Sequence, residues 1–169
     1  VVSTQCGDRS CEVLSLGAAG EDMVTVNMGS AAIADLPAGL SFPFPGVHVD
    51  VGNPHYVAFV PDCEDVVLEE IGPPIEHAPV FPDRINVQIA SVQGDGTLRL
   101  RTWERGSGVT KACGTGACAV AAAYLNQEVS GPNTVKLELD GGHLDITRRG
   151  DELWMTGPAR CVYSGVVPD

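Results

Sequence analysis

The sequence is poor in basic residues and lacks a long apolar segment. Ten Lys and Arg residues stand against 22 Asp and Glu, which gives the 169-residue chain a formal net charge of −12. Because like charges repel, so acidic a chain is not expected to bind nucleic acids or anionic membrane surfaces. No run of about 18 apolar residues is present, so no membrane-spanning helix is expected. No signal peptide is recognisable in the printed sequence,.

The cysteines and histidines do not show the spacing of a zinc site or of a disulfide scaffold. There is no C-x-x-C pair, and the four histidines are scattered along the chain,. A chain of this length, with 44% hydrophobic residues, can bury a core without disulfides or metals,. We therefore expect one domain without a metal, with reduced thiols, in the cytoplasm. The six cysteines are Cys6, Cys11, Cys63, Cys113, Cys118 and Cys161.

Alternation of apolar and polar residues predicts that most of the chain forms strands. Near the C-terminus, hairpin turns at 140–142 and 149–151 separate three such runs, which indicates an antiparallel meander,. Residues 30–45 are rich in Ala, Gly and Pro and are expected to form an irregular connection,. The runs with a strand pattern are 23–28, 47–51, 56–60, 85–89, 98–103, 135–139, 144–146 and 153–155,.

One segment has the composition of a buried helix. Residues 114–126 follow a glycine-rich turn, and residues 117–123 carry no charge, so this helix is expected to be buried on every side,. Residues 62–70 predict a second, shorter helix that ends at the Gly-Pro-Pro sequence of residues 72–74,. A single apolar helix among antiparallel strands predicts an α+β fold, with a curled, mainly antiparallel sheet or barrel wrapped around one central helix.

The start of this helix carries the most informative chemistry. Cys113 precedes Gly114 and Gly116, which let backbone N–H groups come close to a bound group,. The unpaired N–H groups of a helix start attract an anion, and the helix dipole is expected to lower the pKa of the Cys113 thiol. The segment could therefore hold a carboxylate and present a base or a nucleophile to it. A buried cysteine at an ordinary glycine turn is the simpler alternative.

A dinucleotide site is a second alternative for the same segment. Residues 114–119 fit the fingerprint G-x-G-x-x-A, and Asp140 lies near the offset of about 20 residues expected for a ribose-binding acid,. That fingerprint follows directly on a buried strand, whereas residues 106–111 form a polar, glycine-rich stretch. The context therefore disfavours NAD(P) binding, which a fluorescence titration would detect.

Five short motifs, taken together, resemble the diaminopimelate epimerase family in order and spacing. The resemblance covers roughly residue 24 to the end of the chain. It implies a protein with two similar domains, each a curled sheet around a central helix, of which this chain is the second. The motifs are Gly52-Asn53-Pro54-His55, Ile85-Asn86-Val87, Trp103-Glu104-Arg105-Gly106, Ala112-Cys113-Gly114-Thr115-Gly116 and Met155-Thr156-Gly157-Pro158-Ala159.

The resemblance also implies a domain division and an activity. Residues 1–159 would form the C-terminal catalytic domain, and residues 160–169 a tail that pairs with a missing N-terminal domain. The implied reaction inverts the α-carbon of LL-2,6-diaminopimelate to the meso isomer, in lysine and peptidoglycan precursor synthesis, without pyridoxal phosphate or another cofactor. Inversion needs a base on one face of the carbon and an acid on the other, hence two cysteines. The family's other motif, Cys-Gly-Asn-Gly, has no counterpart here, so the chain is expected to be inactive alone.

The roles of individual residues follow from the resemblance. Cys113 would be the catalytic thiol of one face, and the amides of Gly114 and Thr115 would stabilise charge on the substrate carboxylate. Glu104 would contact the substrate amino group and tune the Cys113 thiol, and Arg105 would clamp the distal carboxylate.

Three further residues complete the implied site. Asn53 and Asn86 would bind the distal end of the substrate, and His55 would tune the cysteine of the missing domain. Without the resemblance, each of these residues has a simpler interpretation: a turn residue, an exposed strand residue and a structural histidine. Glu104 and Arg105 could equally be solvated surface charges.

Other functions stay open at this point. A proline racemase or a phenazine-pathway isomerase would use the same scaffold, and a non-catalytic binding or assembly module could retain half a site. A homodimer is one possible assembly. Cys118 lies about 140° around the helix from Cys113 and should face away from the site. Cys6, Cys11, Cys63 and Cys161 have no assigned role.

Overall fold

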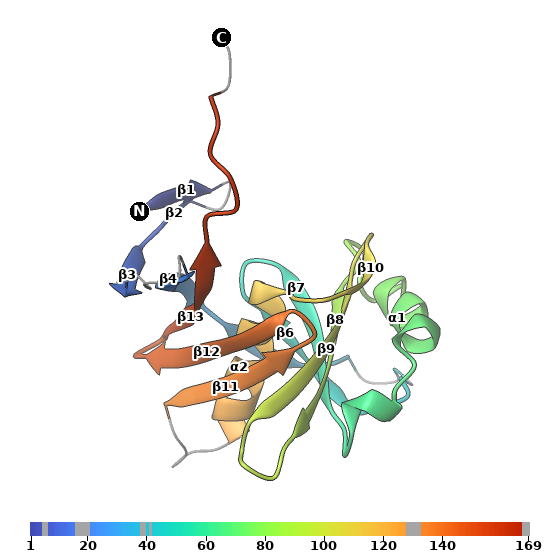
Figure 1. Ribbon diagram of the computed structural model, residues 1–169. Coiled ribbons are helices and arrows are strands. Elements are labelled where there is room, and N and C mark those ends of the chain that lie inside the picture. Colours follow the sequence, from blue (N-terminus) through green and yellow to red (C-terminus); the bar gives the residue numbers. More distant parts are fainter. Residues whose placement is uncertain (5–6, 16–20, 38–39, 41, 128–132, 167–169) are drawn as a thin grey trace.

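A sheet of eleven strands curls around one central helix, α2 (Gly114–Gln127) (Figure 1). The computed structural model of the protein describes all residues except 5–6, 16–20, 38–39, 41, 128–132 and 167–169. The short strand β10 (Gly108–Thr110) pairs with β9 at the side of the main path. The other strands, in spatial order, are β3 (Cys11–Ser15), β4 (Glu21–Ser30), β13 (Glu152–Arg160), β12 (Gly142–Arg149), β11 (Thr134–Leu139), β9 (Leu98–Glu104), β8 (Asn86–Val92), β7 (Pro54–Phe59), β6 (Gly46–Asp50) and β5 (Ala32–Asp35).

One continuous stretch of chain supplies strands near both ends of the sheet. β4 pairs with β13 and β5 pairs with β6, while only Ala31 separates β4 from β5 along the chain. The sheet therefore bends back on itself around α2, although its hydrogen-bonded path stays open between β3 and β5. The predicted α+β fold, with a curled, mainly antiparallel sheet around a central helix, is confirmed. The described strands do not close it into a hydrogen-bonded barrel.

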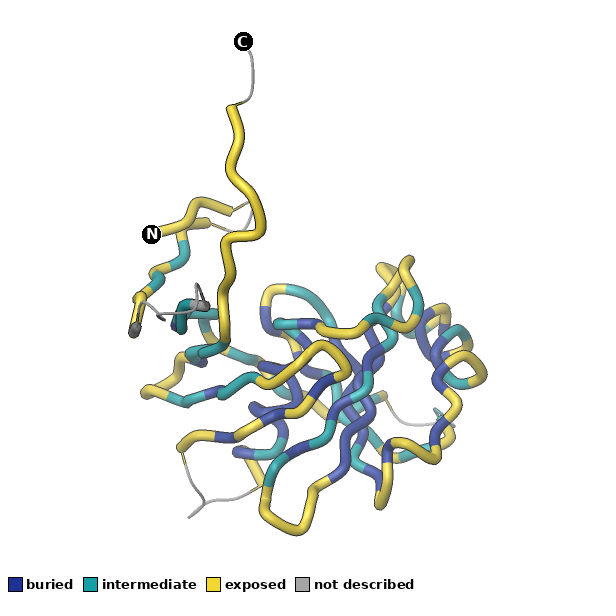
Figure 2. The backbone as a smooth tube through the Cα atoms, in the orientation of Figure 1, coloured by how far each residue is buried: buried dark blue, intermediate teal, exposed yellow. Residues whose placement is uncertain are grey.

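Two parallel strand pairs determine where the helices lie. β7 pairs in parallel with β8, and β9 with β11. A parallel pair needs a crossover connection, and the chain forms α1 (Leu68–Glu76) in the first crossover and α2 in the second. α2 contacts β6, β7, β8, β11, β12 and β13, whereas α1 contacts β8, β9 and β10. β8 is consequently buried on both faces, as its dark blue path in Figure 2 shows.

The central helix is buried as its composition predicts. Residues 116–123 of α2 are buried, and the apolar side chains of β9, β11 and β12 that point inward complete the core around it. In β11 the alternation is regular, since Val135, Leu137 and Leu139 are buried and the residues between them are exposed. No helix in the described part of the chain is long and apolar enough to cross a membrane.

The prediction for the shorter helix was wrong in its boundaries. Residues 63–65 form one turn of 3-10 helix, η1 (Cys63–Asp65), and α1 begins only at Leu68 and runs through Pro73 and Pro74. The Gly-Pro-Pro sequence lies inside the helix, and Gly72 is needed there for packing, since a Cβ atom would lie 2.4 Å from the Trp103 ring. The prolines remove two donors, but the last turn is held by a bond from the His77 N–H to the Pro73 carbonyl (3.1 Å).

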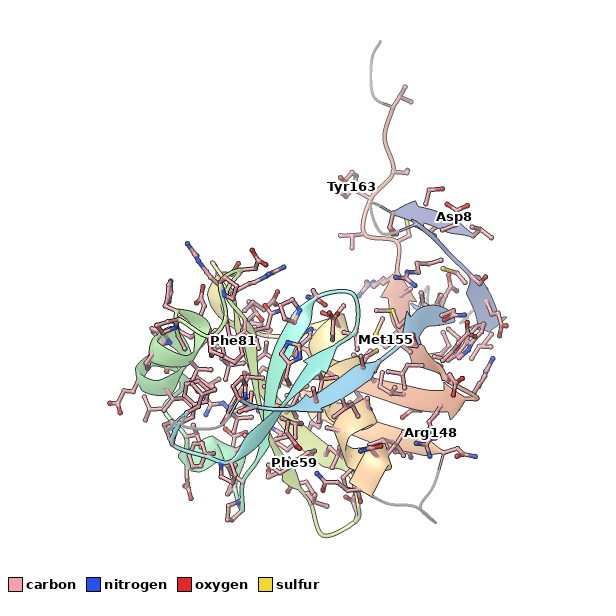
Figure 3. The ribbon with its side chains drawn as sticks, turned by 180° about the vertical axis from the view of Figure 1, so that it is seen from behind. Asp8, Phe59, Phe81, Arg148, Met155 and Tyr163 are labelled. Carbon is pink, nitrogen blue, oxygen red and sulfur yellow. The ribbon has the colours of Figure 1, made fainter. Side chains whose placement is uncertain are left out.

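The two ends of the described chain extend away from the domain body. Strands β1 (Val2–Thr4) and β2 (Gly7–Arg9) form a separate hairpin for which the sequence analysis made no prediction. Beyond β13 the chain runs outward, and Val162 and Tyr163 are 85% and 87% exposed. Figure 3 shows Tyr163 on this projecting tail, away from the domain body. Within residues 30–45, predicted to be irregular, the chain forms β5.

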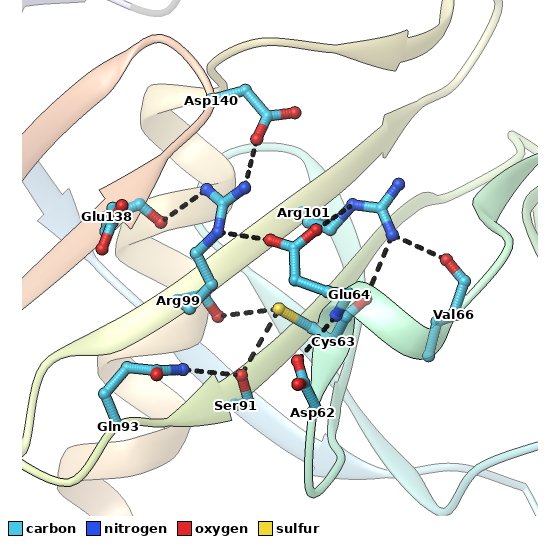
Figure 4. Close-up of polar contacts among 10 residues, drawn as sticks. All are labelled: Asp62, Cys63, Glu64, Val66, Ser91, Gln93, Arg99, Arg101, Glu138 and Asp140. Carbon is cyan, nitrogen blue, oxygen red and sulfur yellow. Dashed lines mark hydrogen bonds and ion pairs between the residues drawn. The ribbon is translucent and has the colours of Figure 1, made fainter.

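A polar network fastens η1 to the sheet, on the face opposite α2 (Figure 4). Arg99 of β9 pairs with Glu64 of η1 (2.7 Å) and with Asp140 after β11. Arg101 donates to the carbonyl of Cys63 (3.1 Å), and burial raises the pKa of the Cys63 thiol. Cys63 is therefore a structural thiol. Since Asp140 is paired with Arg99, it is not free to bind a ribose, which further weakens the dinucleotide alternative.

Candidate functional site

The Cys113 sulfur lies against the first turn of α2. The Gly116 N–H donates to the Cys113 Sγ (3.3 Å), and the Thr115 Oγ1 lies 3.5 Å from the same sulfur. Gly114 and Gly116 both allow close approach. A Cβ atom on Gly114 would lie 3.2 Å from the Met155 Sδ, and one on Gly116 would lie 2.6 Å from the side-chain amide of Gln88. The two glycines therefore let side chains of β13 and β8 pack directly on the helix start.

The expected direction of the thiol pKa was wrong. Burial raises the pKa of Cys113 above its ordinary value of 9.0, and the charge of Glu104 acts in the same direction. Hydrogen bonds from Thr115 and Gly116 lower it, but burial outweighs them, since Cys113 is only 8% exposed. Cys113 therefore rests as a protonated thiol. Cys118 lies in the core around α2, where burial raises its pKa to about 12.

The turn between β6 and β7 brings Asn53 to the helix start. Gly52 has φ +97°, and its N–H donates to the Asp50 carboxylate (2.7 Å), which fixes the turn. The Asn53 Nδ2 donates to the Thr115 Oγ1 (3.3 Å), and its Oδ1 lies 3.1 Å from the Nε2 of His55. Two motifs that are 62 positions apart are thereby joined.

Asn86 joins two further motifs by its side-chain amide. It stands at the start of β8, beside His55 in the parallel β7, and is 4% exposed. Its Nδ2 donates to the Pro54 carbonyl (3.1 Å), and its Oδ1 accepts from the Arg105 N–H (3.0 Å). Asn86 therefore positions the Asn-Pro turn relative to Arg105. Its predicted direct contact with a substrate stays a prediction.

Glu104 and Arg105 lie where β9 turns into β10. The Glu104 carboxylate accepts from the Thr110 hydroxyl (2.6 Å), and the Arg105 guanidinium donates to the Asp83 carbonyl (2.9 Å). A buried residue that the sequence analysis did not single out holds this turn. Glu76 of α1 accepts from the Trp103 Nε1 (2.7 Å) and from the Gly106 N–H (2.9 Å).

A cavity of about 570 Å³ opens beside these residues, between the β6–β7 turn, β4 and the N-terminal hairpin. Asn53, Arg105 and Thr115 line it, and so do Arg9 and Cys11, which sequence reasoning missed. The position of Cys11 follows from the strand register and not from any sequence motif. Cys11 pairs with Val26 and Val26 with Met155, so all three side chains share the inner face of the sheet. Within the described residues Arg9 has no ion-pair partner, so the cavity has two cationic groups available for an anion.

The predicted site residues thus meet around one end of α2, but not all of them line the cavity. Cys113 lies one contact behind it, through Thr115, and Asn86 through Arg105, while Glu104 precedes Arg105 in the chain and does not line the cavity. His55 is fully buried and contacts Asn53. In the described part of the chain, no group of three or more His, Cys, Asp or Glu side chains is placed to hold a metal ion.

Comparisons with known proteins identify relatives of similar sequence. A family profile described as diaminopimelate epimerase matches residues 47–162. The diaminopimelate epimerase of Bacteroides thetaiotaomicron is 45% identical over 145 residues, which cover 84% of this chain and 54% of that protein. The one from Synechococcus sp. strain JA-3-3Ab is 48% identical over 126 residues, covering 72% and 44%. The chain spans about half the length of the curated relatives that it matches.

Solved structures share the architecture at much lower identity. A probable proline racemase from Agrobacterium radiobacter K84, with bound carbonate, matches with a TM-score of 0.67 at 15% identity, covering 99% of this chain and 59% of that one. A phenazine biosynthesis protein of the PhzF family from Bacillus anthracis matches with a TM-score of 0.64 at 16% identity, covering 90% and 62%. These likenesses establish the fold alone.

Proposed function

Because the chain belongs to the diaminopimelate epimerase family, we propose that it is the C-terminal catalytic part of an isomerase that inverts the α-carbon of LL-2,6-diaminopimelate to the meso isomer. The reaction would serve lysine and peptidoglycan precursor synthesis and would need no cofactor. The observation that carries the proposal is the group around Cys113, in which the motifs shared with the family come together at one helix start.

The chemistry assigned to Cys113 is proton transfer on one face of the α-carbon. In one direction, a base on the opposite face removes the α-proton, and the Cys113 thiol gives its own proton to the resulting carbanion. The thiolate that remains is stabilised by the Gly116 N–H and the Thr115 hydroxyl, which already contact the sulfur. In the other direction, Cys113 acts as a thiolate and accepts the α-proton. Its raised pKa suits the acid role at rest,.

The helix start, the cavity lining and Glu104 beside it supply the groups that would hold the substrate. The amides of Gly114 and Thr115 are assigned to the carboxylate on the reacting carbon, where charge develops, and such a donor is worth about 3 kcal/mol in other enzymes. Arg105 and Arg9 line the cavity and are assigned to the distal carboxylate,. Glu104 and Asn53 are assigned to the ammonium groups, with Asn86 acting on Arg105 and His55 on Asn53.

We further propose that this chain holds one of two half-sites. A second acid or base on the opposite face would come from an N-terminal domain, and the tail at 160–169 would pair with that domain. The exposed Val162, Tyr163 and Val166 support this assignment, since apolar side chains 85–94% exposed gain free energy when they are covered,. A homodimer and a cytoplasmic location remain predictions.

The test measures deuterium entry at the α-carbon and the ratio of LL to meso isomer. The chain alone should give no meso product, and a supplied N-terminal half from a relative should restore it, with Cys113→Ala inactive. Meso product from the purified chain that is lost in Cys113→Ala would contradict the half-site proposal. Cys11→Ser then becomes decisive, because Cys11 lines the same cavity and would be the second acid.

A binding assay separates this function from those of the related folds. Calorimetric titration should detect diaminopimelate and not proline, and Arg105→Met should weaken binding about tenfold or more, since a hydrogen bond to a charged group is worth about 1.5–3 kcal/mol. Arg9→Met should act in the same direction. Arg149→Met, which changes an exposed arginine outside the cavity, is the matched control. Equal binding of proline and diaminopimelate would favour a proline racemase.

A further inference from the structure

Two polar residues are buried between the sheet and α2, away from the cavity lining. Gln88 of β8 is fully buried and Thr102 of β9 is 2% exposed, and the two are direct neighbours across the β8–β9 pair. The Thr102 hydroxyl donates to the Gln88 Oε1 (2.7 Å). Burying polar groups costs free energy unless their bonds are made inside the protein. The Gln88 Nε2, which the bond from Thr102 does not satisfy, therefore needs an acceptor inside the protein.

The partner of Gln88 is the buried histidine of the Asn-Pro-His turn. The Gln88 Nε2 lies 3.1 Å from the His55 Nδ1, and the His55 Nε2 lies 3.1 Å from the Asn53 Oδ1. The same Gln88 amide packs on Gly116, where no Cβ atom could be accommodated. Gln88 thus contacts the helix start and the turn at once.

The chemistry of the amides gives this row of contacts one direction. An amide nitrogen only donates and an amide oxygen only accepts. The Gln88 Nε2 must therefore donate to an unprotonated Nδ1 of His55, and the Asn53 Oδ1 must accept from a protonated Nε2. His55 is then the neutral tautomer with its proton on Nε2, and both of its nitrogens are occupied.

The direction continues to the sulfur of Cys113. The Asn53 Nδ2 donates to the Thr115 Oγ1, which leaves the proton of that hydroxyl free to point at the Cys113 Sγ. Every donor in the row, from Thr102 through Gln88, His55, Asn53 and Thr115, therefore faces the thiol end. Polarisation along such a row strengthens the last bond.

We propose that Gln88 and Thr102 are positioning residues of this site. They act through His55 and Asn53 to keep the Thr115 hydroxyl donating its hydrogen bond to the sulfur of Cys113. His55 is accordingly a neutral link in the row, not a base that exchanges protons with a substrate. This inference rests on the proposed function, because it concerns the same thiol. Gln88 and Thr102 lie outside the five motifs, so the motifs give them no role in the site.

The charges around the row agree with a neutral His55. The pKa of His55 is lowered to about 4, and burial is the largest cause; Arg105 and His48 act in the same direction and Asp50 opposes them. At the sulfur, Glu104 is the charged group whose effect opposes the thiolate. The Thr115 hydroxyl, at the end of the row, and the Gly116 N–H lower the pKa of Cys113 and so act against Glu104 and against burial.

The first test identifies the tautomer of His55 in the whole chain by ¹⁵N NMR. The resonances of His55, assigned by their loss in His55→Ala, should show a proton on Nε2 and none on Nδ1 at neutral pH. A proton on Nδ1 would mean that both amides are turned the other way. The Thr115 hydroxyl would then donate to Asn53 instead of the sulfur, and the proposal would be overturned.

The second test follows the rate of Cys113 alkylation by iodoacetamide as a function of pH, read by mass spectrometry. Gln88→Leu should raise the midpoint of this profile by about one unit, so that alkylation below the midpoint slows about tenfold. Thr102→Val should move it less in the same direction, and Thr102→Ser, which keeps the hydroxyl, should restore it. Gln93→Leu is the matched control. Gln93 is an exposed glutamine directly after β8, and its replacement should leave the profile unchanged.

Neither measurement needs a substrate, so the two proposals can fail separately. A folded Gln88→Leu chain with an unchanged Cys113 profile would overturn the role of Gln88. If Gln88→Leu does not fold, Thr102→Val and the His55 tautomer still decide. A chain with the expected tautomer and profile that binds no diaminopimelate would contradict the proposed function alone.

Discussion

Glu76 is the residue whose replacement should damage the site most severely from a distance. Its carboxylate is 3% exposed and accepts from the Trp103 indole N–H, the Gly106 N–H and, at 3.4 Å, the Arg84 guanidinium. The Trp103 and Gly106 donors belong to the turn that carries Glu104 and Arg105. Removing the carboxylate therefore leaves both N–H groups of that turn without their acceptor.

The size of the effect follows from those contacts. Glu76→Leu should destabilise the chain by about 3–5 kcal/mol, because it removes two hydrogen bonds to a charged group, each worth about 1.5–3 kcal/mol,. Glu76→Gln keeps one acceptor oxygen and should cost about 1–2 kcal/mol. A typical domain has about 5–15 kcal/mol of total stability, so the first variant approaches unfolding.

The pH dependence of the Glu76 contribution has a definite sign. Burial acts to raise the pKa of Glu76, but the bonds from Trp103 and Gly106 and the charges of His77 and Arg84 outweigh it, and the pKa lies below its ordinary 4.5. A carboxyl with a lowered pKa stabilises the fold above its unfolded value and loses that contribution as pH falls through its folded value. The advantage of the unmodified chain over Glu76→Gln should therefore be constant near neutral pH and shrink below 4.5.

Urea unfolding, followed by tryptophan fluorescence at several pH values, measures these differences. Glu70→Gln is the matched control, since Glu70 lies on the same helix and is exposed, and it should change stability by less than about 0.5 kcal/mol. A loss of under about 1 kcal/mol in Glu76→Leu, with an unchanged slope against urea, would refute the argument from the hydrogen bonds of Glu76.

Two further variants test packing and surface charge. Gly72→Ala should cost about 1–3 kcal/mol, because its Cβ would meet the Trp103 ring, whereas Gly94→Ala, at an open position, should be nearly neutral in the same urea assay,. Arg99→Met should cost only about 1 kcal/mol, because Glu64 and Asp140 are partly exposed, and 0.5 M salt should narrow the difference,. A salt-independent loss would indicate that the packing of the Arg99 stem dominates.

The sequence predicts the elements whose pattern is local. The strands of the C-terminal meander and the central helix follow from alternation and from an uncharged stretch, and their boundaries differ by only a few residues from those observed. The N-terminal hairpin was missed because β1 and β2 are three residues each and bury little. The extent of α1 was misjudged because the reason for Gly72 lies in Trp103, which is 31 positions away in the sequence.

The motifs name residues of the site but not its electrostatics. Helix-start geometry suggested a lowered pKa for Cys113, and the structure does place the Gly116 N–H on its sulfur. The net direction is nevertheless upward, because the thiol is buried, and no local pattern reveals that burial. Burial is a property of the tertiary structure, and for this thiol it outweighs the local hydrogen bonds.

The polar residues of β8 show why the supporting residues of the site escape sequence reasoning. Alternation in this strand suggests that Asn86 and Gln88 face solvent, yet Val87 and Ile89 pack on the core beside α1 while the polar residues face α2. Both faces of the strand are buried, so its polar face can only be turned toward partners inside the protein. Gln88 finds them in Thr102 and His55, and Asn86 in Arg105. An alternating strand between two helical crossovers should therefore be examined for a polar face directed at a site.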